Sequence, residues 1–348
     1  MRNFYFIFFL LLWIKNSYAE YFIPDSSPPV FRSSKHKNNF VFQARRGEKY
    51  WIINWTKKRT HVQIREDWTP PGWVEVSLGK VVPEDPPDSQ PNFEVYNRIF
   101  ELDSEYRVKI TANEQLATVH YPNTLFPDIT TAKELHFSYE LTYQFIQKFD
   151  PTNRGFAEVP DVQIDEFLNR IKDMKPIKYA LEKTGKSLAD FKKVWFGEGN
   201  AFEHVFSGEV RERGKRIGGY HWWYTYYRDE RNSPKNRNRA VSFHKIIYGK
   251  PELLEPGKAD PRILTFSFSL DPDGIGKLPW YKKKIGGFST RNSVAAMMAL
   301  GHLIFFLEKP RNSFIRCNIN GRIYKWVCAK TRDLTSLITL YPKFEGKY

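Results

Sequence analysis

Two histidines in glycine-rich and aromatic segments are the side chains of this sequence best suited to moving protons. His204 lies in FEHVFSGE at residues 202–209, and His221 follows seventeen residues later in GYHW at residues 219–222. Because an imidazole has a pKa near 6.5, one ring can accept a proton at neutral pH while another donates one. A single histidine is usually structural, but two in such similar surroundings indicate one general acid–base site.

Two carboxylates flank the first histidine. Glu203 precedes His204 directly and Glu209 follows it by five residues. A carboxylate in such a position can orient an imidazole or tune its pKa. Both could equally be solvated, or could pair with the nearby Arg211 and Arg213.

Composition and charge limit the classes of partner. The 348 residues are 41% hydrophobic and 16% aromatic, enough for a large core, and the formal net charge is +15. Such a charge favours anionic polymers, namely nucleic acid, heparan-type glycans or an acidic membrane surface, although a basic protein without a polyanion partner is the plain alternative. Basic residues lie between and after the two histidines, at Arg211, Arg213, Lys215, Arg216, Arg228, Arg231, Lys235, Arg237 and Arg239.

The first 19 residues have the pattern of a cleaved signal peptide rather than of a membrane anchor. A weakly basic start is followed by an apolar run at residues 4–14 and by Ser-Tyr-Ala at residues 17–19. The run is too short to span a bilayer, and no later stretch approaches the apolar length that spanning needs. We therefore expect a secreted protein, monomeric and without stable membrane insertion.

Secretion permits disulfides and glycosylation. The two cysteines, Cys317 and Cys328, lie on either side of the turn of a hairpin that residues 314–327 are predicted to form around Asn320-Gly321. That register places Cys317 opposite residue 324 and Cys328 opposite residue 313, too far apart for a disulfide unless the strands bend, so two unpaired thiols are favoured. Asn54, in Asn-Trp-Thr, is the one usable glycosylation sequon.

Hydrophobic periodicity predicts an α+β fold with helices first and antiparallel strands later. The helical spacing occurs at residues 94–102, 132–149, 162–174, 187–194 and 293–307. The strand pattern occurs at residues 218–227, 241–248, 263–270, 314–327 and 337–341. Pro176 is expected to end the third helix, and the aromatic run after His221 is expected to be a core strand.

Composition also predicts the domain boundaries. Residues 20–91 form an N-terminal extension that is partly β-prone, with a poorly ordered start at residues 20–38 and a Pro/Asp-rich linker at residues 81–91. Residues 92–348 form the main domain.

Four segments resemble the successive motifs of the EndoU (XendoU-like, poly(U)-specific) endoribonuclease family. They are FEHVFSGE at residues 202–209, GYHW at 219–222, KKIGGF at 283–288 and LITLYP at 337–342. The resemblance covers residues 92–348. It implies a secreted endoribonuclease that cuts single-stranded RNA at uridylates, usually with manganese, and leaves 2′,3′-cyclic phosphate ends. It also implies a helical N-terminal part and antiparallel β-sheets flanking a catalytic cleft.

The same resemblance assigns His204 and His221 as the proton-transfer pair and Lys283 as the catalytic lysine, with Lys282 and Lys284 as neighbours that the alignment could confuse with it. RNA carries its own nucleophile, the 2′-OH, so cleavage needs only a base, an acid and a cation. The sequence does not separate the two proton roles, and base for His221 and acid for His204 is a working assignment.

Thr339 and Tyr341 match the C-terminal motif, where a hydroxyl and an aromatic face could hold a pyrimidine, although Tyr341 could also be strand core. The chain departs from the family at two places. Trp222 stands where the family has asparagine, and SVAAM at residues 293–297 stands where the family has Ser-Pro-Glu-Phe-Glu.

No metal-ligand set is evident, because the two cysteines are eleven residues apart and no His-x-x-His pattern occurs. Mn²⁺, implied only by the resemblance, would then act through RNA phosphates or weak carboxylate contacts. The main alternative function is a secreted RNA-binding or polyanion-binding protein on the same scaffold that does not cleave. The remaining histidines are expected to be structural, namely His36, His61, His120, His136, His244 and His302.

Overall fold

The computed structural model divides into two compact units, Met1–Ser89 and Gln90–Tyr348. It describes residues 20–34, 39–48, 50–52, 54–64, 72–83, 90–108, 135–149, 159–211, 216–231, 240–248, 263–272, 280–289, 292–319 and 322–343. The predicted signal peptide lies outside these ranges. None of the helices within them is both long and apolar enough to cross a bilayer.

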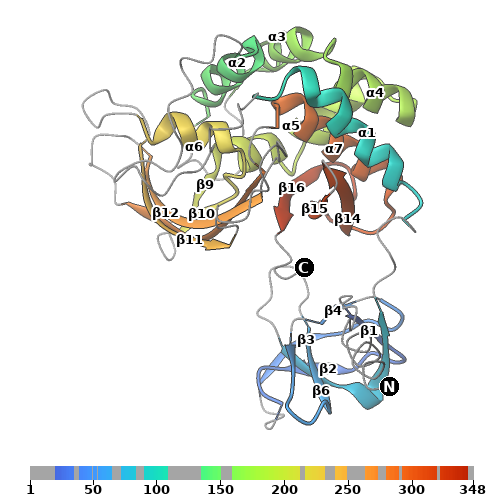
Figure 1. Cartoon of the computed structure of the whole chain (residues 1–348). Helices are drawn as coiled ribbons and strands as arrows, with labels where there is room; N and C mark the ends of the chain where they lie inside the picture. Colours follow the sequence, from blue (N-terminus) through green and yellow to red (C-terminus); the bar gives the residue numbers. More distant parts are fainter. Residues whose placement is uncertain are drawn as a thin grey trace, which may run out of the picture. The chain divides into compact units, whose positions relative to one another are not determined.

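The N-terminal unit (blue in Figure 1) contains two antiparallel sheets, with strand orders β4-β1-β8 and β3-β2-β7-β6-β5. Their strands are β1 Glu20–Pro24, β2 Pro29–Phe31, β3 Phe40–Gln43, β4 Tyr50–Trp51, β5 Asn54–Trp55, β6 His61–Ile64, β7 Gly72–Glu75 and β8 Gly79–Pro83. The prediction of a poorly ordered start is wrong for residues 20–34, because Phe22 and Val30 anchor β1 and β2 in a core of their own. Asn54 of the sequon lies in β5, opposite Gln63.

The second unit begins with five helices, and most of the predicted ones are found. They are α1 Phe93–Leu102, α2 Phe137–Ile146, α3 Asp161–Ile171, α4 Lys175–Thr184 and α5 Leu188–Phe196. The first residues of the helix predicted at 132–149 lie outside the described residues. The interpretation of Pro176 is wrong, since it lies in the first turn of α4, where a missing N–H costs no helical hydrogen bond.

Two sheets complete this unit, and the α+β class is confirmed. Their strand orders are β11-β12-β13-β10-β9 and β14-β15-β16. Among the described strands, β10 and β13 pair in parallel and the other pairs are antiparallel. The strands are β9 Glu209–Arg211, β10 Arg216–Gly218, β11 Ala240–Tyr248, β12 Ile263–Asp271, β13 Tyr281–Ser289, β14 Asn312–Ile319, β15 Arg322–Lys330 and β16 Leu337–Lys343. Figure 1 shows the helices gathered over the two sheets, which meet where β13 contacts β16.

One strand prediction is wrong. The aromatic run after His221 forms the helix α6, Trp223–Asp229, and not a strand. Trp223, Tyr224, Tyr226 and Tyr227 are all buried, so the run is apolar on every side and carries neither a two-residue nor a 3.6-residue period.

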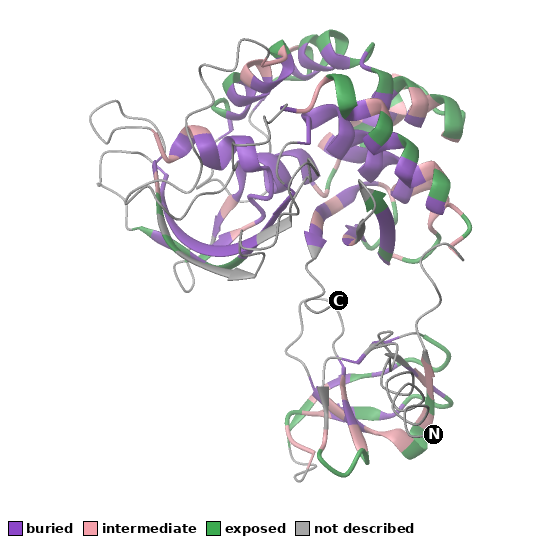
Figure 2. Ribbon diagram, in the orientation of Figure 1, coloured by how far each residue is buried: buried purple, intermediate pink, exposed green. Residues whose placement is uncertain are grey.

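The helix α7, Val294–Leu307, is confirmed and forms the centre of the core. It is buried along most of its length (purple in Figure 2) and contacts α1, α4, α5, β15 and β16. Ser293 caps it by accepting a hydrogen bond from the Ala296 N–H, at 3.2 Å. A helix that is hydrophobic on all sides belongs inside a protein, which is why this segment can hold the helices and the sheets together.

The hairpin register is confirmed. Cys317 lies opposite Tyr324 and Cys328 opposite Ser313, and both cysteines are free and buried. Burial raises the pKa of Cys328 to about 12, so this thiol is protonated at neutral pH. The predicted turn residues lie outside the described residues.

Candidate active site

His204 is carried by a π-helical turn, Glu203–Ser207, a geometry that often marks functional sites. Its Nδ1 lies 3.0 Å from the Glu209 Oε1 atom, which orients the ring from the start of β9. A protonated His204 would form an ion pair at this distance. Of the two carboxylates suggested by the sequence, Glu209 thus contacts the histidine, whereas Glu203 is buried and accepts a hydrogen bond from the Asn200 side chain.

Backbone hydrogen bonds join the second histidine segment to the first. The N–H groups of Tyr220 and His221 donate to the carbonyls of His204 and Val205, at 2.7 and 2.6 Å. Gly219 has a φ of +60°, and a Cβ atom there would lie 1.7 Å from the His204 carbonyl oxygen. Only glycine permits this approach, which places the two imidazole centroids 6.2 Å apart.

The environment of His221 favours its neutral form. Burial, followed by the charges of Lys283 and His204, holds the pKa of this imidazole well below its usual 6.5. Its Nδ1 lies 3.0 Å from the carbonyl oxygen of Gly287. Because a carbonyl can only accept, Nδ1 carries the hydrogen and Nε2 keeps its lone pair. The ring is therefore prepared to accept a proton at Nε2.

The three consecutive lysines of β13 differ in burial. Lys282 and Lys284 are exposed, whereas Lys283 is buried and its ammonium donates a hydrogen bond to the Gly219 carbonyl. The register with β12 shifts between Phe266 and Phe268, so a β-bulge lies directly after Lys283. Bulges re-aim side chains beside many active sites. Lys283 is the one lysine of the three that lies with the histidines.

Residues of β16 complete the site. The ring of Tyr341 stacks on His221, with centroids 4.8 Å apart and planes at 18°. Thr339 lies two residues earlier, on the same side of the strand, and its buried hydroxyl has no hydrogen-bond partner within the described residues. The sheet of β16 therefore meets the sheet of Lys283 at the histidines.

The three central side chains are little exposed, at 2% for His204, 6% for His221 and 7% for Lys283. The polar atoms of each side chain nevertheless form a hydrogen bond and are not packed against hydrocarbon alone. Glu209 and Tyr341 are partly exposed and mark the side from which the site meets solvent.

Some residues that position others carry no motif in the sequence. Asn200 has a φ of +41° and bonds Glu203, and the buried Asp103 accepts hydrogen bonds from the Ser293 N–H and hydroxyl at the start of α7. Neither residue lies in a motif. Gly219 and Gly287 lay inside quoted motifs, and the double glycines at 218–219 and 286–287 were the available signal.

The residues present do not form a metal cage. Within the described ranges, no three histidine, cysteine or acidic side chains converge as ligands. Glu203 and Glu209 are engaged by Asn200 and His204.

The second unit is an α+β domain in which two histidines and a lysine lie together, and comparisons with known proteins identify its family. The model of the family "Endoribonuclease XendoU" matches residues 162–342, just over half of the chain. The chain belongs to this family.

Two curated relatives match a shorter stretch. A "Uridylate-specific endoribonuclease" of Homo sapiens is 30% identical over 151 residues, covering 39% of this chain and 31% of that protein. The Bos taurus protein of the same name is 29% identical over 132 residues, covering 35% and 27%. The chain thus spans less than a third of the length of these relatives.

A solved structure shows the fold. It is described as "The structure of XendoU: a splicing independent snoRNA processing endoribonuclease" and matches with a TM-score of 0.52 and 18% identity. The match covers 73% of this chain and 97% of that one.

Proposed function

We propose that this protein is an endoribonuclease that cleaves single-stranded RNA at uridylates and leaves 2′,3′-cyclic phosphate ends. The observation that carries the proposal is the convergence of a neutral His221, a His204 bonded to Glu209, and the Lys283 ammonium. These are the base, the acid and the cation that cleavage by the RNA 2′-OH requires.

Each side chain has one role in the proposed reaction. Nε2 of His221 takes the proton of the 2′-OH, and the O2′ atom attacks phosphorus. A protonated His204 gives its proton to the departing O5′ atom as the P–O5′ bond breaks. Lys283 carries three donors, so it can keep the Gly219 carbonyl and also bind the phosphoryl oxygen on which charge develops.

Thr339 and Tyr341 are the proposed uracil contacts. A buried hydroxyl without a partner costs about 1–3 kcal/mol, so the Thr339 side chain favours a ligand that supplies a hydrogen bond. Tyr341 is stacked on His221 through one face, and its partial exposure leaves another part of the side chain for a base. Uridine preference at this position therefore places the 2′-OH next to His221.

Four further properties of the protein are proposed from the sequence. They are secretion directed by residues 1–19, glycosylation at Asn54, a monomeric state, and stimulation by Mn²⁺ held through RNA phosphates. The charge of +15 also supports binding of other polyanions, and a protein that binds RNA without cutting it is the competing function.

The product ends decide between these two functions. A uridine-containing oligonucleotide is incubated with and without Mn²⁺, and cyclic phosphate at the uridine is the expected product. His221→Ala and His204→Ala should each lower the rate by about 10²–10⁴ while RNA affinity stays within a few fold. His244→Ala is the matched control, because this exposed histidine bonds Ser269 on β12. If the unaltered protein leaves the RNA intact, the proposal that it is an endoribonuclease is refuted.

A further inference from the structure

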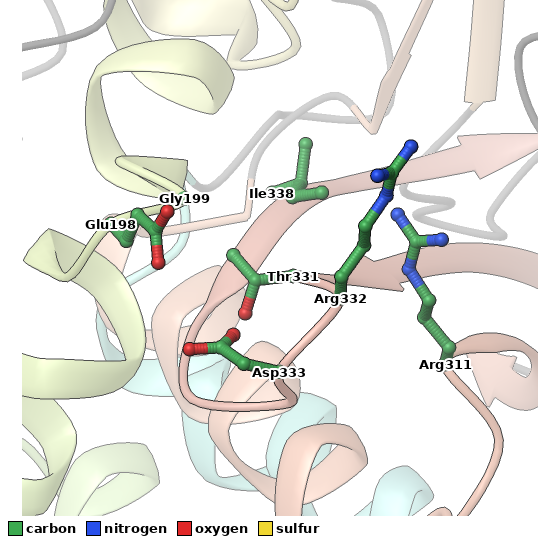
Figure 3. Close-up of a pocket in the computed structure, with 7 residues that line it drawn as sticks. All are labelled: Glu198, Gly199, Arg311, Thr331, Arg332, Asp333 and Ile338. Carbon is green, nitrogen blue, oxygen red and sulfur yellow. The ribbon is translucent and has the colours of Figure 1, made fainter.

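A polar pocket lies beside the site, between the end of α5 and the loop that joins β15 to β16. Its volume is about 460 Å³. Figure 3 shows Glu198 on one side and the guanidinium groups of Arg311 and Arg332 on the other, with Ile338 between them. Gly199, Thr331 and Asp333 complete the lining. The pocket thus offers positive charge, carboxylates and one apolar surface.

The loop that carries Arg332 and Asp333 is held in one shape by its own hydrogen bonds. Thr331 N–H donates to the Ser336 carbonyl at 2.9 Å. The Asp333 carboxylate accepts from the Thr335 N–H at 3.2 Å and from its hydroxyl at 2.8 Å. The charged side chains at the pocket therefore project from a loop whose backbone is already ordered, which lowers the free-energy cost of ordering them around a ligand.

The opposite wall of the pocket is hydrogen-bonded to the same loop. Gly199 N–H donates to the Ser336 hydroxyl at 2.9 Å, and a Cβ atom on Gly199 would lie 1.9 Å from the Leu337 carbonyl oxygen. The backbone at Glu198 is thus held against β16. Five residues after Glu198 the same segment reaches Glu203, at the start of the turn that carries His204.

The two arginines provide the anion-binding side. Arg311 is anchored by its Nε–H to the Lys330 carbonyl at 3.1 Å. Arg332 is exposed and forms no ion pair with the residues that the structure describes. Two guanidinium groups on one side of a pocket repel each other, and a phosphate between them relieves that repulsion with charge-assisted hydrogen bonds.

The pocket is close to the catalytic residues but separate from them. Ile338 lies in a β-bulge of β16, directly before Thr339, and is three residues from Tyr341. Three residues of a strand span roughly 10 Å. A phosphate held by the arginines is therefore a different phosphate from the one that is cleaved, on the same short stretch of RNA.

We propose that this pocket binds a second nucleotide of the RNA substrate, outside the cleaved uridylate. Its phosphate lies on Arg311 and Arg332, its sugar or base contacts Ile338, and its hydroxyl or N–H donors bond Glu198 and Asp333. The carboxylates of Glu198 and Asp333 disfavour a bare phosphate and favour a ligand that also brings donors. The inference rests on the proposed function for its substrate class.

Binding of an RNA that cannot be cleaved tests the pocket independently of catalysis. The probe is an eight-nucleotide RNA with 2′-deoxyuridine at its single uridine position, measured by fluorescence anisotropy. Arg332→Gln should weaken binding about tenfold and lower the slope of log Kd against log salt by about 0.7. Glu198→Gln should also weaken binding. The matched control is Arg98→Gln, an exposed arginine on α1 paired with Glu101, which should change binding less than twofold.

Cleavage kinetics supply the second measurement. On the all-ribose octamer, Arg332→Gln should raise KM about tenfold with kcat unchanged, and on the dinucleotide UpA it should change neither constant. Unchanged octamer affinity in Arg332→Gln overturns the subsite, and tighter binding by Glu198→Gln overturns the nucleotide assignment. If the unaltered protein cuts neither RNA, the proposed function fails, and the anisotropy series still decides whether the pocket holds a nucleotide.

Discussion

The ring of Tyr341 lies nearly parallel to the imidazole of His221, with centroids 4.8 Å apart and planes at 18°. The two residues come from opposite ends of the second unit's β region, 120 positions apart in the sequence. The stack joins the proposed general base to the strand that also carries Thr339. In the proposed reaction, Tyr341 therefore contacts both the uracil and the histidine that accepts the proton, and a change at Tyr341 should affect uridine preference and rate together.

Substitution of Tyr341 tests this link. Tyr341→Phe keeps an aromatic face on His221 and should retain cleavage within about fivefold, whereas Tyr341→Leu removes the stack, worth about 0.5–1.5 kcal/mol, together with the contact to the base. We expect Tyr341→Leu to lower kcat/KM by about 10- to 100-fold and to reduce the preference for uridine over cytidine. Rates on matched uridine and cytidine oligonucleotides measure both effects. Equal losses in the two variants would assign the role to the hydroxyl and not to the ring.

The charge of Lys283 should be visible in the titration of His221. Burial is the main cause of the lowered pKa of His221, and the Lys283 charge is the next. Lys283→Gln removes that charge, so the pKa of His221 should rise while burial keeps it below 6.5. NMR titration of the His221 ring protons measures the shift. Lys282→Gln and Lys284→Gln are matched controls, because both lysines are exposed on the same strand, and equal shifts in all three variants would contradict the placement of Lys283.

Substitution of two glycines that have nearly the same backbone conformation distinguishes the effect of conformational strain from that of steric contact. Gly219 and Gly185 have φ angles of +60° and +62°, but a Cβ atom on Gly185 meets nothing within 4 Å. Gly185→Ala should therefore lower the free energy of unfolding by only about 1 kcal/mol. Gly219→Ala pushes against the His204 carbonyl and should lower activity at least 100-fold as the two imidazoles move apart. Activity and thermal stability of both variants provide the comparison, and equal activity would show that the close approach is not required.

Local patterns predicted much of this fold. The hairpin register, with Cys317 opposite Tyr324, followed from one turn signal, and α7 followed from its apolar length. Predictions failed where the local signal was ambiguous. Pro176 is compatible with both the end and the start of a helix, so its position alone did not settle which one it marks. The aromatic run of α6 is buried on all sides and carried no period that would settle its structure.

The site was predicted through its motifs, and its supporting contacts were not. The resemblance assigned His204, His221 and Lys283, with Lys282 and Lys284 as neighbours that the alignment could confuse with the lysine. The β-bulge in β13 that sets Lys283 apart from them leaves no pattern in the sequence. The motifs also missed Asp103, whose contact with Ser293 joins residues 190 positions apart. Contacts of that range arise from packing and leave no local pattern in the sequence.

Asp103 gives the stability of the protein a characteristic dependence on pH. Its carboxyl is fully buried, and burial raises its pKa to about 7, although the Ser293 hydrogen bonds and Arg107 lower it. The same carboxyl has a pKa of 3.8 when it is unperturbed. Between these values the unfolded chain releases a proton that the folded chain keeps. The contribution of Asp103 to the free energy of unfolding is therefore fully present below pH 3.8 and is lost as the pH rises to about 7.

Asp103→Asn removes this titration and keeps an acceptor for the Ser293 N–H. A shift of about three pKa units corresponds to roughly 4 kcal/mol, so the unaltered protein should lose up to that much stability, relative to Asp103→Asn, between pH 4 and pH 7. Chemical denaturation at a series of pH values measures the two slopes. Glu94→Gln, an exposed carboxylate on α1, should leave the slope of the unaltered protein unchanged. Parallel slopes for Asp103→Asn and the unaltered protein would show that Asp103 is ionised in the folded state, in which case its charge stabilises the start of α7 throughout this range.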